Sequence, residues 1–561
     1  MDRIWLKSYP PHVPADIDPS QLGSLKELLE QACARYPERA AFVQMGTELT
    51  FGRLDELTRA FAAWLQHAGL RKGDRIAIML PNTLQYPVAM FGALRAGLVV
   101  VNTNPLYTAP ELEHQLSDSG AIAIVVLENF AHVVQQVLEH TSVKRVLVTA
   151  AGDLLKFPKS YLVNFVVRHV HKRVPAWHIP GALPFTSALR EGHKLPLAPV
   201  EVGAEDLAFL QYTGGTTGVA KGAMLSHGNV STNVLQAEAW LGKLFHDSAG
   251  VLITAIPLYH IFALSANCML FARLGWKNVL IINPRDLPSL IADIKRHPPN
   301  FISGVNTLFN AMLHAPGFAQ IDFSNLKVTL GGGMAVQATV AERWKEATGN
   351  VLTQAWGLTE TSPAACINPN NEPFNGSIGL PIPSTEIAIK DDAGNDLPLG
   401  QIGEICVRGP QVMKGYWNRP DETAKVMLPG GWLRTGDVGR MDPRGYVYIE
   451  DRKKDMILVS GFNVYPNEVE AAAAGCPGIL EAAAVAQPDE HSGEVVALFV
   501  VRKDPTLTEQ QIMDWCRKSL AGYKVPKHIY FRNELPKTNV GKILRRGLRD
   551  ELAQMSGRSP H

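Results

Sequence analysis

The chain has 561 residues, more than one hydrophobic core usually organises, so we expect three or four packed units. Hydrophobic residues make up 46% of the chain and charged residues 19%, a composition that is typical of folded proteins and excludes extensive disorder. With 54 basic and 53 acidic side chains the net charge is +1, so no general positive field is present to hold a nucleic acid. Any recognition of phosphate must therefore be local.

Apolar, β-branched runs alternate with amphipathic stretches through the first third of the chain. The clearest runs are RIAIML at 75–80, AIAIVVL at 121–127 and VKRVLVT at 143–149. This alternation predicts an α/β fold built on parallel strands. After Glu201 the turns that follow the strands become rich in glycine, and the carboxyl ends of parallel strands are where such folds bind ligands.

Residues 156–174 predict a basic amphipathic helix, in a region from Leu154 to Arg190 that has no Asp or Glu. Its basic residues are Lys156, Lys159, Arg168, Lys172 and Arg173, and its apolar positions are Val163, Val166, Val167, Val170 and Val174. A helix of this kind can lie on an anionic bilayer. A helix packed on the rest of the protein would show the same pattern, so both alternatives stay open.

TGGTTGVAKG, at 213–222, follows the strand-like run LAFLQY and predicts a phosphate-binding loop. Glycine backbone N–H groups can surround phosphate oxygens, threonine hydroxyls add donors and a lysine adds a mobile cation. The residues concerned are Thr213, Gly214, Gly215, Thr216, Thr217, Gly218 and Lys221. A Walker A loop would need Gly at Ala220 and Ser or Thr at Gly222, so that class of nucleotide site is excluded. The alternative is a surface turn.

Residues 249–272 contain no Asp, Glu, Lys or Arg and are long enough to span a membrane. Pro257, His260 and Asn267 interrupt the stretch, and we interpret it as buried core. The amino terminus has no apolar run of signal-peptide length, and the six dispersed cysteines do not have the spacing of a zinc site. We expect a cytoplasmic protein, peripheral on the cytoplasmic face of the membrane if 156–174 binds lipid.

The charged run EDRKKD at 450–455 separates a large region from a small one that has its own strand and helix signals. We place an N-terminal domain at 1–450, a linker at 451–455 and a C-terminal domain at 456–561.

Several motifs occur in a fixed order along the chain: YTGGTTGVAKGAMLSH, PLYHIFAL, GVNTLFN, GGGM, WGLTE, GWLRTGD, DRKKDMILVSGFNVYPNEVE and LPKTNVGKILRR. Together they resemble the adenylate-forming enzymes, a superfamily of acyl-CoA synthetases, luciferases and peptide-synthetase adenylation domains. The resemblance covers the whole chain and is closest to the bacterial long-chain fatty acyl-CoA synthetases. It implies an α/β fold, with a large multi-subdomain N-terminal domain and a small, mobile α+β C-terminal domain. It also implies fatty acid, ATP, Mg²⁺ and coenzyme A as substrates and cofactors.

The same resemblance assigns roles to single residues. Glu360 and Thr216 would hold Mg²⁺, with Thr359 beside them. Asp437 would accept hydrogen bonds from the ribose, supported by Arg452. Residues around the adenine would be Gly331, Gly332, Gly333, Trp356 and Gly357, of which Trp356 would stack on the base unless it is plain core.

Lys542 resembles the C-terminal lysine that bridges the attacking carboxylate and the α-phosphate. Its alternative is a solvated basic helix face. Lys454 matches the hinge position of the family, and Gly461 matches the glycine that lines the pantetheine tunnel. His260 resembles the residue at the carboxylate end of the acyl pocket, although a lone histidine in an apolar run is often a core residue.

Ala263 stands where peptide-synthetase adenylation domains place an Asp that binds the substrate's amino group. An amino acid would bury an unpaired ammonium there, so an apolar acid is favoured. A fatty acyl-AMP ligase, a medium-chain or aryl acyl-CoA ligase, a luciferase and a catalytically silent lipid-binding protein remain alternatives. The sequence leaves open the acyl chain length, any transport partner and the oligomeric state, including a homodimer.

Overall fold

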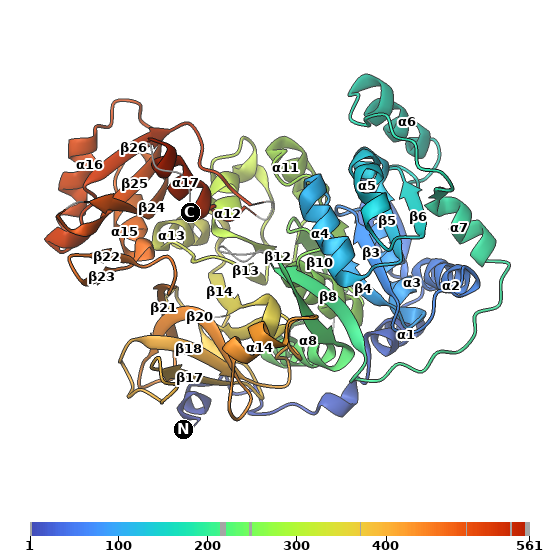
Figure 1. Ribbon diagram of the computed structural model, residues 1–561, viewed down its shortest axis with the longest axis horizontal. Helices are drawn as coiled ribbons and strands as arrows, with labels where there is room; N and C mark the ends of the chain where they lie inside the picture. The colour runs from blue at the N-terminus through green and yellow to red at the C-terminus, as the bar shows by residue number, and fades with distance from the viewer. Residues whose placement is uncertain are drawn as a thin grey trace.

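Four β-sheets organise the computed structural model, which describes residues 3–213, 220–245, 249–370, 372–489, 491–538 and 541–555 (Figure 1). A seven-stranded sheet has the order β7-β6-β5-β3-β4-β8-β9 and is parallel except for β9. Its strands are β3 (Arg75–Met79), β4 (Val99–Asn102), β5 (Ala123–Leu127), β6 (Arg145–Thr149), β7 (Leu183–Pro184), β8 (Leu207–Thr213) and β9 (Lys221–Ser226). The three strand-like runs predicted before residue 150 are confirmed as β3, β5 and β6.

A nine-stranded sheet has the order β16-β15-β14-β13-β12-β10-β11-β1-β2, with a parallel centre from β14 to β1. Its strands are β1 (Ala40–Gln44), β2 (Thr47–Thr50), β10 (Val251–Thr254), β11 (Lys277–Leu280), β12 (Phe301–Gly304), β13 (Val328–Gly331), β14 (Leu352–Gly357), β15 (Ala364–Ile367) and β16 (Leu380–Pro381). The carboxyl ends of β13 and β14 carry the GGGM and WGLTE motifs, as the glycine-rich turns predict.

Helices cover these two sheets and pack into one large apolar cluster and two smaller ones. They are α1 (Leu25–Arg35), α2 (Phe51–His67), α3 (Gln85–Arg95), α4 (Ala109–Ser119), α5 (Ala131–Val137), α7 (Phe185–Gly192), α8 (His227–Leu241), α11 (Leu287–Arg296), α12 (Asn306–Leu313) and α13 (Ala338–Thr348). The uncharged stretch 249–272 is confirmed as core: it forms β10, the short helix α9 (Ile261–Ala263), a π-helical turn (Leu264–Met269) and α10 (Leu270–Arg273). Among the described residues, no helix has both the length and the apolar character that a membrane span requires.

Two smaller sheets complete the chain. One contains β17 (Glu386–Lys390), β18 (Gly403–Arg408), β19 (Met427–Leu428), β20 (Trp432–Met441) and β21 (Val447–Arg452), with the short helix α14 (Pro420–Val426) beside it. The last contains β22 (Ile457–Val459), β23 (Phe462–Val464), β24 (Ile479–Asp489), β25 (Gly493–Arg502) and β26 (His528–Arg532), with α15 (Pro466–Ala474), α16 (Glu509–Cys516) and α17 (Arg545–Met555). This last sheet has apolar clusters of its own. The predicted fold class, an α/β fold with a large N-terminal domain and a small α+β C-terminal domain, is confirmed.

An ion cluster joins β21 to the C-terminal part. The carboxylate of Asp451 is fully buried, and the guanidinium of Arg545 lies 3.5 Å from it and 2.9 Å from Glu470. Burial raises the pKa of Asp451 to about 6, an effect that Arg545 opposes. A buried carboxylate needs such partners because an isolated charge is costly to remove from water. The cluster thereby fixes the start of α17, just after Lys542.

The basic segment 156–174 forms a helix that projects from the seven-stranded sheet (Figure 1). It comprises α6 (Lys159–Phe165) and a π-helical turn (Val166–Val170), so it is shorter than predicted. Asn164 donates to Asp153, and Arg168 donates two hydrogen bonds to Glu128. These contacts orient the helix so that Val163, Val166 and Val167 are half-buried, while a different set of apolar side chains faces outward: Phe157, Tyr161, Leu162, Phe165 and Val170.

Candidate active site

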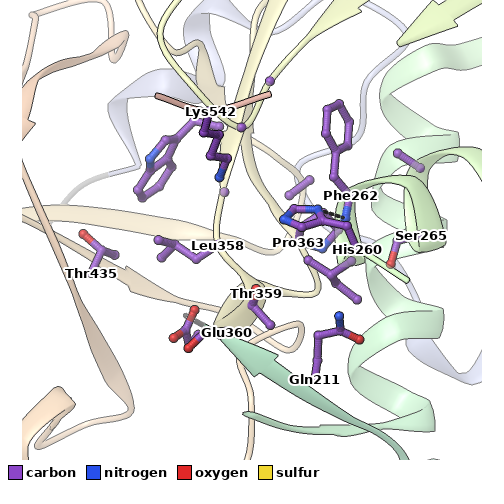
Figure 2. Close-up of a pocket in the computed structure, with 18 of the residues that line it drawn as sticks. Gln211, His260, Phe262, Ser265, Leu358, Thr359, Glu360, Pro363, Thr435 and Lys542 are labelled. Atoms are coloured by element: carbon purple, nitrogen blue, oxygen red, sulfur yellow. Dashed lines mark hydrogen bonds between the residues drawn. The ribbon is translucent and has the colours of Figure 1, made fainter. Parts of the chain in front are cut away.

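One cavity of about 960 Å³ lies where the two large sheets, the β17–β21 sheet and the C-terminal part meet (Figure 2). Its walls come from segments far apart in the sequence. The predicted site residues that line it are Thr213, Lys221, His260, Gly332, Gly333, Trp356, Gly357, Thr359, Glu360, Arg452, Lys454 and Lys542. Most of the described residues that the sequence singled out are therefore gathered in one place.

Lys542 enters the cavity on the turn before α17. Its N–H donates to Thr538 Oγ1 at 3.1 Å, and its carbonyl accepts from the Thr538 N–H at 2.7 Å, which closes the turn. Thr307 of α12 donates through its hydroxyl to the Gly541 carbonyl at 2.9 Å. The GVNTLFN motif, whose residues from Asn306 form the first half of α12, thus fastens the C-terminal part to the large part. None of the residues of this motif lines the cavity.

The Lys542 ammonium approaches Leu358 and Thr359 in the centre of the pocket (Figure 2). A methyl group added at Gly333 would lie 3.3 Å from Lys542 Cε, so a larger residue at 333 would push the lysine aside. Burial and, to a lesser extent, the charge of Arg452 lower the pKa of Lys542 to about 8, while Asp437 and Glu360 oppose this shift. Lys542 is therefore a desolvated cation, as expected of a residue that stabilises reacting anions.

His260 begins α9, and its Nδ1 accepts the Phe262 N–H at 3.3 Å. Burial, with Lys542 nearby, lowers the pKa of His260 to about 3, so the ring is neutral at physiological pH. With Nδ1 used as an acceptor, the proton of the neutral ring is assigned to Nε2. His260 can then donate one hydrogen bond in the cavity without adding charge.

Glu360 and Thr359 lie in a single 3₁₀ turn (Thr359–Thr361) directly after β14. Tyr416 donates through its hydroxyl to Glu360 Oε1 at 2.7 Å, which orients the carboxylate. No group of three or more His, Cys, Asp or Glu side chains able to hold a metal occurs among the described residues. Mg²⁺ often takes only one or two carboxylates and completes its shell with phosphates and water, so Glu360 fits the expected role. Thr216, the other expected ligand, lies outside the described residues.

Asp437 is buried behind the cavity wall, because Trp356 and Arg452 stand between it and the open space. Trp356 Nε1 donates to Asp437 Oδ2 at 2.9 Å, and Arg452 Nε lies 3.1 Å from Oδ1. No hydrogen bond reaches Asp437 Oδ1, which leaves a buried acceptor beside the nucleoside position that the sequence predicts. Trp356 is thus held edge-on by Asp437 while part of its ring faces the cavity.

The glycines around the predicted adenine position differ in what they do. Gly332 and Gly333 line the cavity, whereas Gly331 does not. A methyl group at Gly331 would meet the Leu352 side chain at 2.5 Å, so Gly331 serves packing between β13 and β14. Gly357 lines the cavity, but a methyl group there would overlap the Pro363 carbonyl. Close packing, in addition to access for a ligand, therefore explains why glycine occurs at these positions.

The predicted phosphate loop is described only at its ends. Gly214, Gly215, Thr216, Thr217 and Gly218 lie outside the described residues. Thr213 ends β8 and Lys221 begins β9, and both line the cavity. Lys221 Nζ forms an ion pair with Glu422 and lies 5.0 Å from the ring centroid of Tyr416.

Lys454 lines the cavity, and burial lowers its pKa. Gly461 lies elsewhere: it is exposed between β22 and β23, and a methyl group built on it would meet no atom within 4 Å. Its φ of +84° favours glycine for conformational reasons. The described arrangement therefore does not bring Gly461 together with Lys542.

An apolar branch of the cavity runs between α8, the α9–α10 segment and the nine-stranded sheet. Val234, Ala237 and Leu241 share one face of α8, and Ala266 and Leu270 share one face of the opposite segment. The sheet contributes Phe301, Leu330, Ala355 and Ile367. No charged side chain stands among these residues, so the branch suits a hydrocarbon chain.

Tyr416, Glu422 and Lys425 were not predicted as site residues. They belong to GYWNRPDETAK, in which the only regular signal is the proline and acidic first turn of α14. That signal predicts a helix start, and nothing in the local pattern indicates contact with Glu360 or Lys221.

The profile of the AMP-binding enzyme family matches residues 29–417, and that of the AMP-binding enzyme C-terminal domain matches residues 468–542. A long-chain-fatty-acid–CoA ligase of Escherichia coli O6:H1 is 55% identical over 98% of both chains, and one of Haemophilus influenzae is 51% identical over 98% of this chain and 99% of its own. Among solved structures, the anthranilate CoA ligase AuaEII in complex with anthranoyl-AMP superposes with a TM-score of 0.86 at 25% identity, covering 96% of this chain and all of the other. With both profiles matched in order around one cavity, the chain belongs to the AMP-binding enzyme family.

Proposed function

We propose that this protein joins a long-chain fatty acid to coenzyme A in two steps, with ATP as the energy source. The fatty acid and ATP first give acyl-AMP and pyrophosphate, and coenzyme A then takes the acyl group and releases AMP. The observation that carries this proposal is that one cavity combines a desolvated Lys542, polar residues that follow the parallel strands and a branch lined by uncharged residues. The names of the full-length relatives support the long-chain substrate.

In the first step a carboxylate oxygen attacks the α-phosphorus, and the bond to the departing pyrophosphate breaks. Two anions must approach each other, so the site has to offset negative charge. Lys542 is placed to contact both the carboxylate and the α-phosphate, while neutral His260 donates a hydrogen bond at the start of the apolar branch. Glu360, oriented by Tyr416, would hold the Mg²⁺ that neutralises phosphate charge.

In the second step the thiol sulfur must reach the acyl carbon that Lys542 covers in this arrangement. We infer that residues 456–561 rotate about the linker near Lys454, and that Gly461 then comes to the cavity. The exposed position of Gly461, beside the exposed rings of Phe462 and Tyr523, supports this inference because it leaves a surface free to meet the large domain. A fatty acyl-AMP ligase would lack this second step.

The apolar branch gives a physical limit to chain length. Leu270, ten residues after His260 along the chain, also lines the branch. Phe301 stands three residues before the carboxyl end of β12, roughly 10 Å below the sheet edge. Its ring lies 4.7 Å from that of Phe271, which in turn packs on Trp276 at 5.1 Å. We infer that this aromatic cluster ends the branch.

The outward side of α6 supports a peripheral membrane contact, through which fatty acid would reach the enzyme. Phe157, Tyr161, Leu162 and Phe165 are 80%, 74%, 62% and 57% exposed, an unusual density of apolar side chains on a surface. Lys156, Lys172 and Arg173 are exposed near them and would attract anionic lipid headgroups.

Lys542→Ala should slow pyrophosphate release in the absence of coenzyme A by about a hundredfold or more, because one cation at the reacting centre is lost. Formation of thioester from supplied acyl-AMP should change little. The two half-reactions are measured separately on the same preparation. An equal loss in both would contradict the role of Lys542.

The rate of the first half-reaction should fall as the pH rises. Lys542 acts in its charged form and has a pKa of about 8, so kcat/KM for ATP should fall above pH 8 as the ammonium loses its proton. Lys542→Arg should be slower but should lack this fall, because a guanidinium stays charged. A fall of the same shape in Lys542→Arg would assign it to another group.

Phe301→Ala should extend the branch. The kcat/KM with very-long-chain fatty acids, divided by the kcat/KM with medium-chain fatty acids, should therefore rise. Ala237→Phe, which fills the branch from α8, should lower the same ratio. Taking a ratio within each variant cancels any loss of folded enzyme, which matters because Phe→Ala in a core costs about 3–5 kcal/mol. Unchanged ratios in both variants would show that the chain lies elsewhere.

Leu162→Asp with Phe165→Asp should reduce flotation of the protein with vesicles rich in anionic phospholipid at low salt. The matched control is Leu399→Asp with Ile402→Asp, which alters two other exposed apolar residues. If both double variants float like the unmodified protein, or if the unmodified protein does not float, the membrane proposal fails.

A further inference from the structure

Glu422 bridges two lysines that line the cavity. Its carboxylate forms an ion pair with Lys221 Nζ on one oxygen and accepts a hydrogen bond from Lys425 Nζ at 2.5 Å on the other. Lys221 and Lys425 line the cavity, whereas Glu422 does not. Both lysines lower the pKa of the Glu422 carboxyl to about 2, so this carboxylate is charged across the physiological pH range.

The position of these lysines indicates what they face. Lys221 follows the predicted phosphate loop, and its ammonium lies over Tyr416, whose hydroxyl donates to Glu360. Glu360 is next to the α-phosphate position of the proposed reaction. Tyr416 thus connects Glu360 to Lys221, and Glu422 connects Lys221 to Lys425. In the proposed reaction, the β- and γ-phosphates of ATP would lie along this chain of contacts.

A purely structural role accounts poorly for the bridge. The side chains of Lys221 and Glu422 are each 29% exposed and that of Lys425 is 67% exposed, and pairs of this exposure contribute little to folding. Glu422 also stands in the first turn of α14, where an acid favours the helix. Asp421 occupies the same turn, but in the described part of the chain it forms no ion pair with either lysine and acts on Lys425 only through its charge.

Resting on the proposed ligase function, we propose that Glu422 is an exchangeable counter-ion for the polyphosphate end of ATP, and that Lys425 is a second cationic ligand of this end beside Lys221. Without nucleotide, Glu422 neutralises both ammonium groups. When ATP enters, its β- and γ-phosphates displace the carboxylate and take over the lysines. After the first step, the return of Glu422 to the lysines promotes departure of pyrophosphate.

This exchange affects only ligands that carry the outer phosphates. ATP and pyrophosphate compete with Glu422, so removing its charge strengthens their binding and slows product release. AMP and acyl-AMP have a single phosphate at the Lys542 end and do not compete. Comparing the binding of pyrophosphate with that of AMP therefore distinguishes a counter-ion role of Glu422 from a general effect of the substitution on the site.

The test measures equilibrium binding of ATP, pyrophosphate and AMP to the full-length protein by calorimetry. Glu422→Gln should tighten binding of ATP and pyrophosphate about two- to fivefold, as expected for loss of one exposed competing charge. Lys425→Ala should weaken both about tenfold, since a charge-assisted contact is lost. Binding of AMP should stay unchanged in both variants. Inhibition of the forward reaction by pyrophosphate should follow the same order.

Asp421→Asn is the matched control, because it removes a neighbouring acid from the same helix turn without touching the lysine pair. It should leave all three affinities unchanged. The inference is overturned if Glu422→Gln weakens pyrophosphate binding, matches Asp421→Asn, or alters AMP binding equally. Failure of the ligase function would look different, since the unmodified protein would then form no acyl-AMP.

Discussion

The structure depends on one ammonium group that is kept away from water. Lys542 is costly to bury alone, and the carboxylates of Asp437 and Glu360 offset only part of that cost. The turn that carries it is held by Thr307, and the helix after it by the ion cluster around Arg545. A site built in this way has an excess of positive potential at its centre. A carboxylate and a phosphate that bind there together balance this positive charge, which the protein's own carboxylates balance only in part.

The cavity divides its chemistry among different elements. Loops after parallel strands provide the polar contacts, because backbone N–H groups and strand ends meet at one edge of a sheet. The apolar branch instead uses helix faces and the interior of the nine-stranded sheet, where uncharged side chains repeat with helical or strand periodicity. The polar part of the cavity therefore suits a nucleotide and the apolar branch suits a hydrocarbon chain. His260 lies where the polar part and the branch meet.

The arrangement that builds the adenylating centre also closes it. Lys542 lines the cavity, where in the proposed reaction it covers the acyl carbon that the thiol must reach, and Gly461 is exposed and does not line the cavity. In the proposed reaction the contacts that fasten the C-terminal part, at Gly541 and at Arg545, must be exchanged between the steps. The hydrogen bond to Gly541 suits such an exchange, since it contributes only modestly to stability. The pair of Arg545 with Asp451 is buried, so these two charges need new partners when it opens.

Much of the fold and several site residues could be predicted from the sequence, because alternating apolar runs specify strands and fixed motifs specify Lys542, His260 and Glu360. The sequence also indicated an apolar acid through Ala263. Only tertiary structure decided that Asp437 lies behind Trp356, that Thr307 docks the C-terminal turn, and that Tyr416 and Glu422 belong to the site. It also decided that Tyr161, Leu162 and Phe165 of α6 face outward, whereas Val163 is half-buried. The physical reason is that periodicity along a chain reports which face of one element is apolar, whereas partners distant in sequence are selected by how whole elements pack.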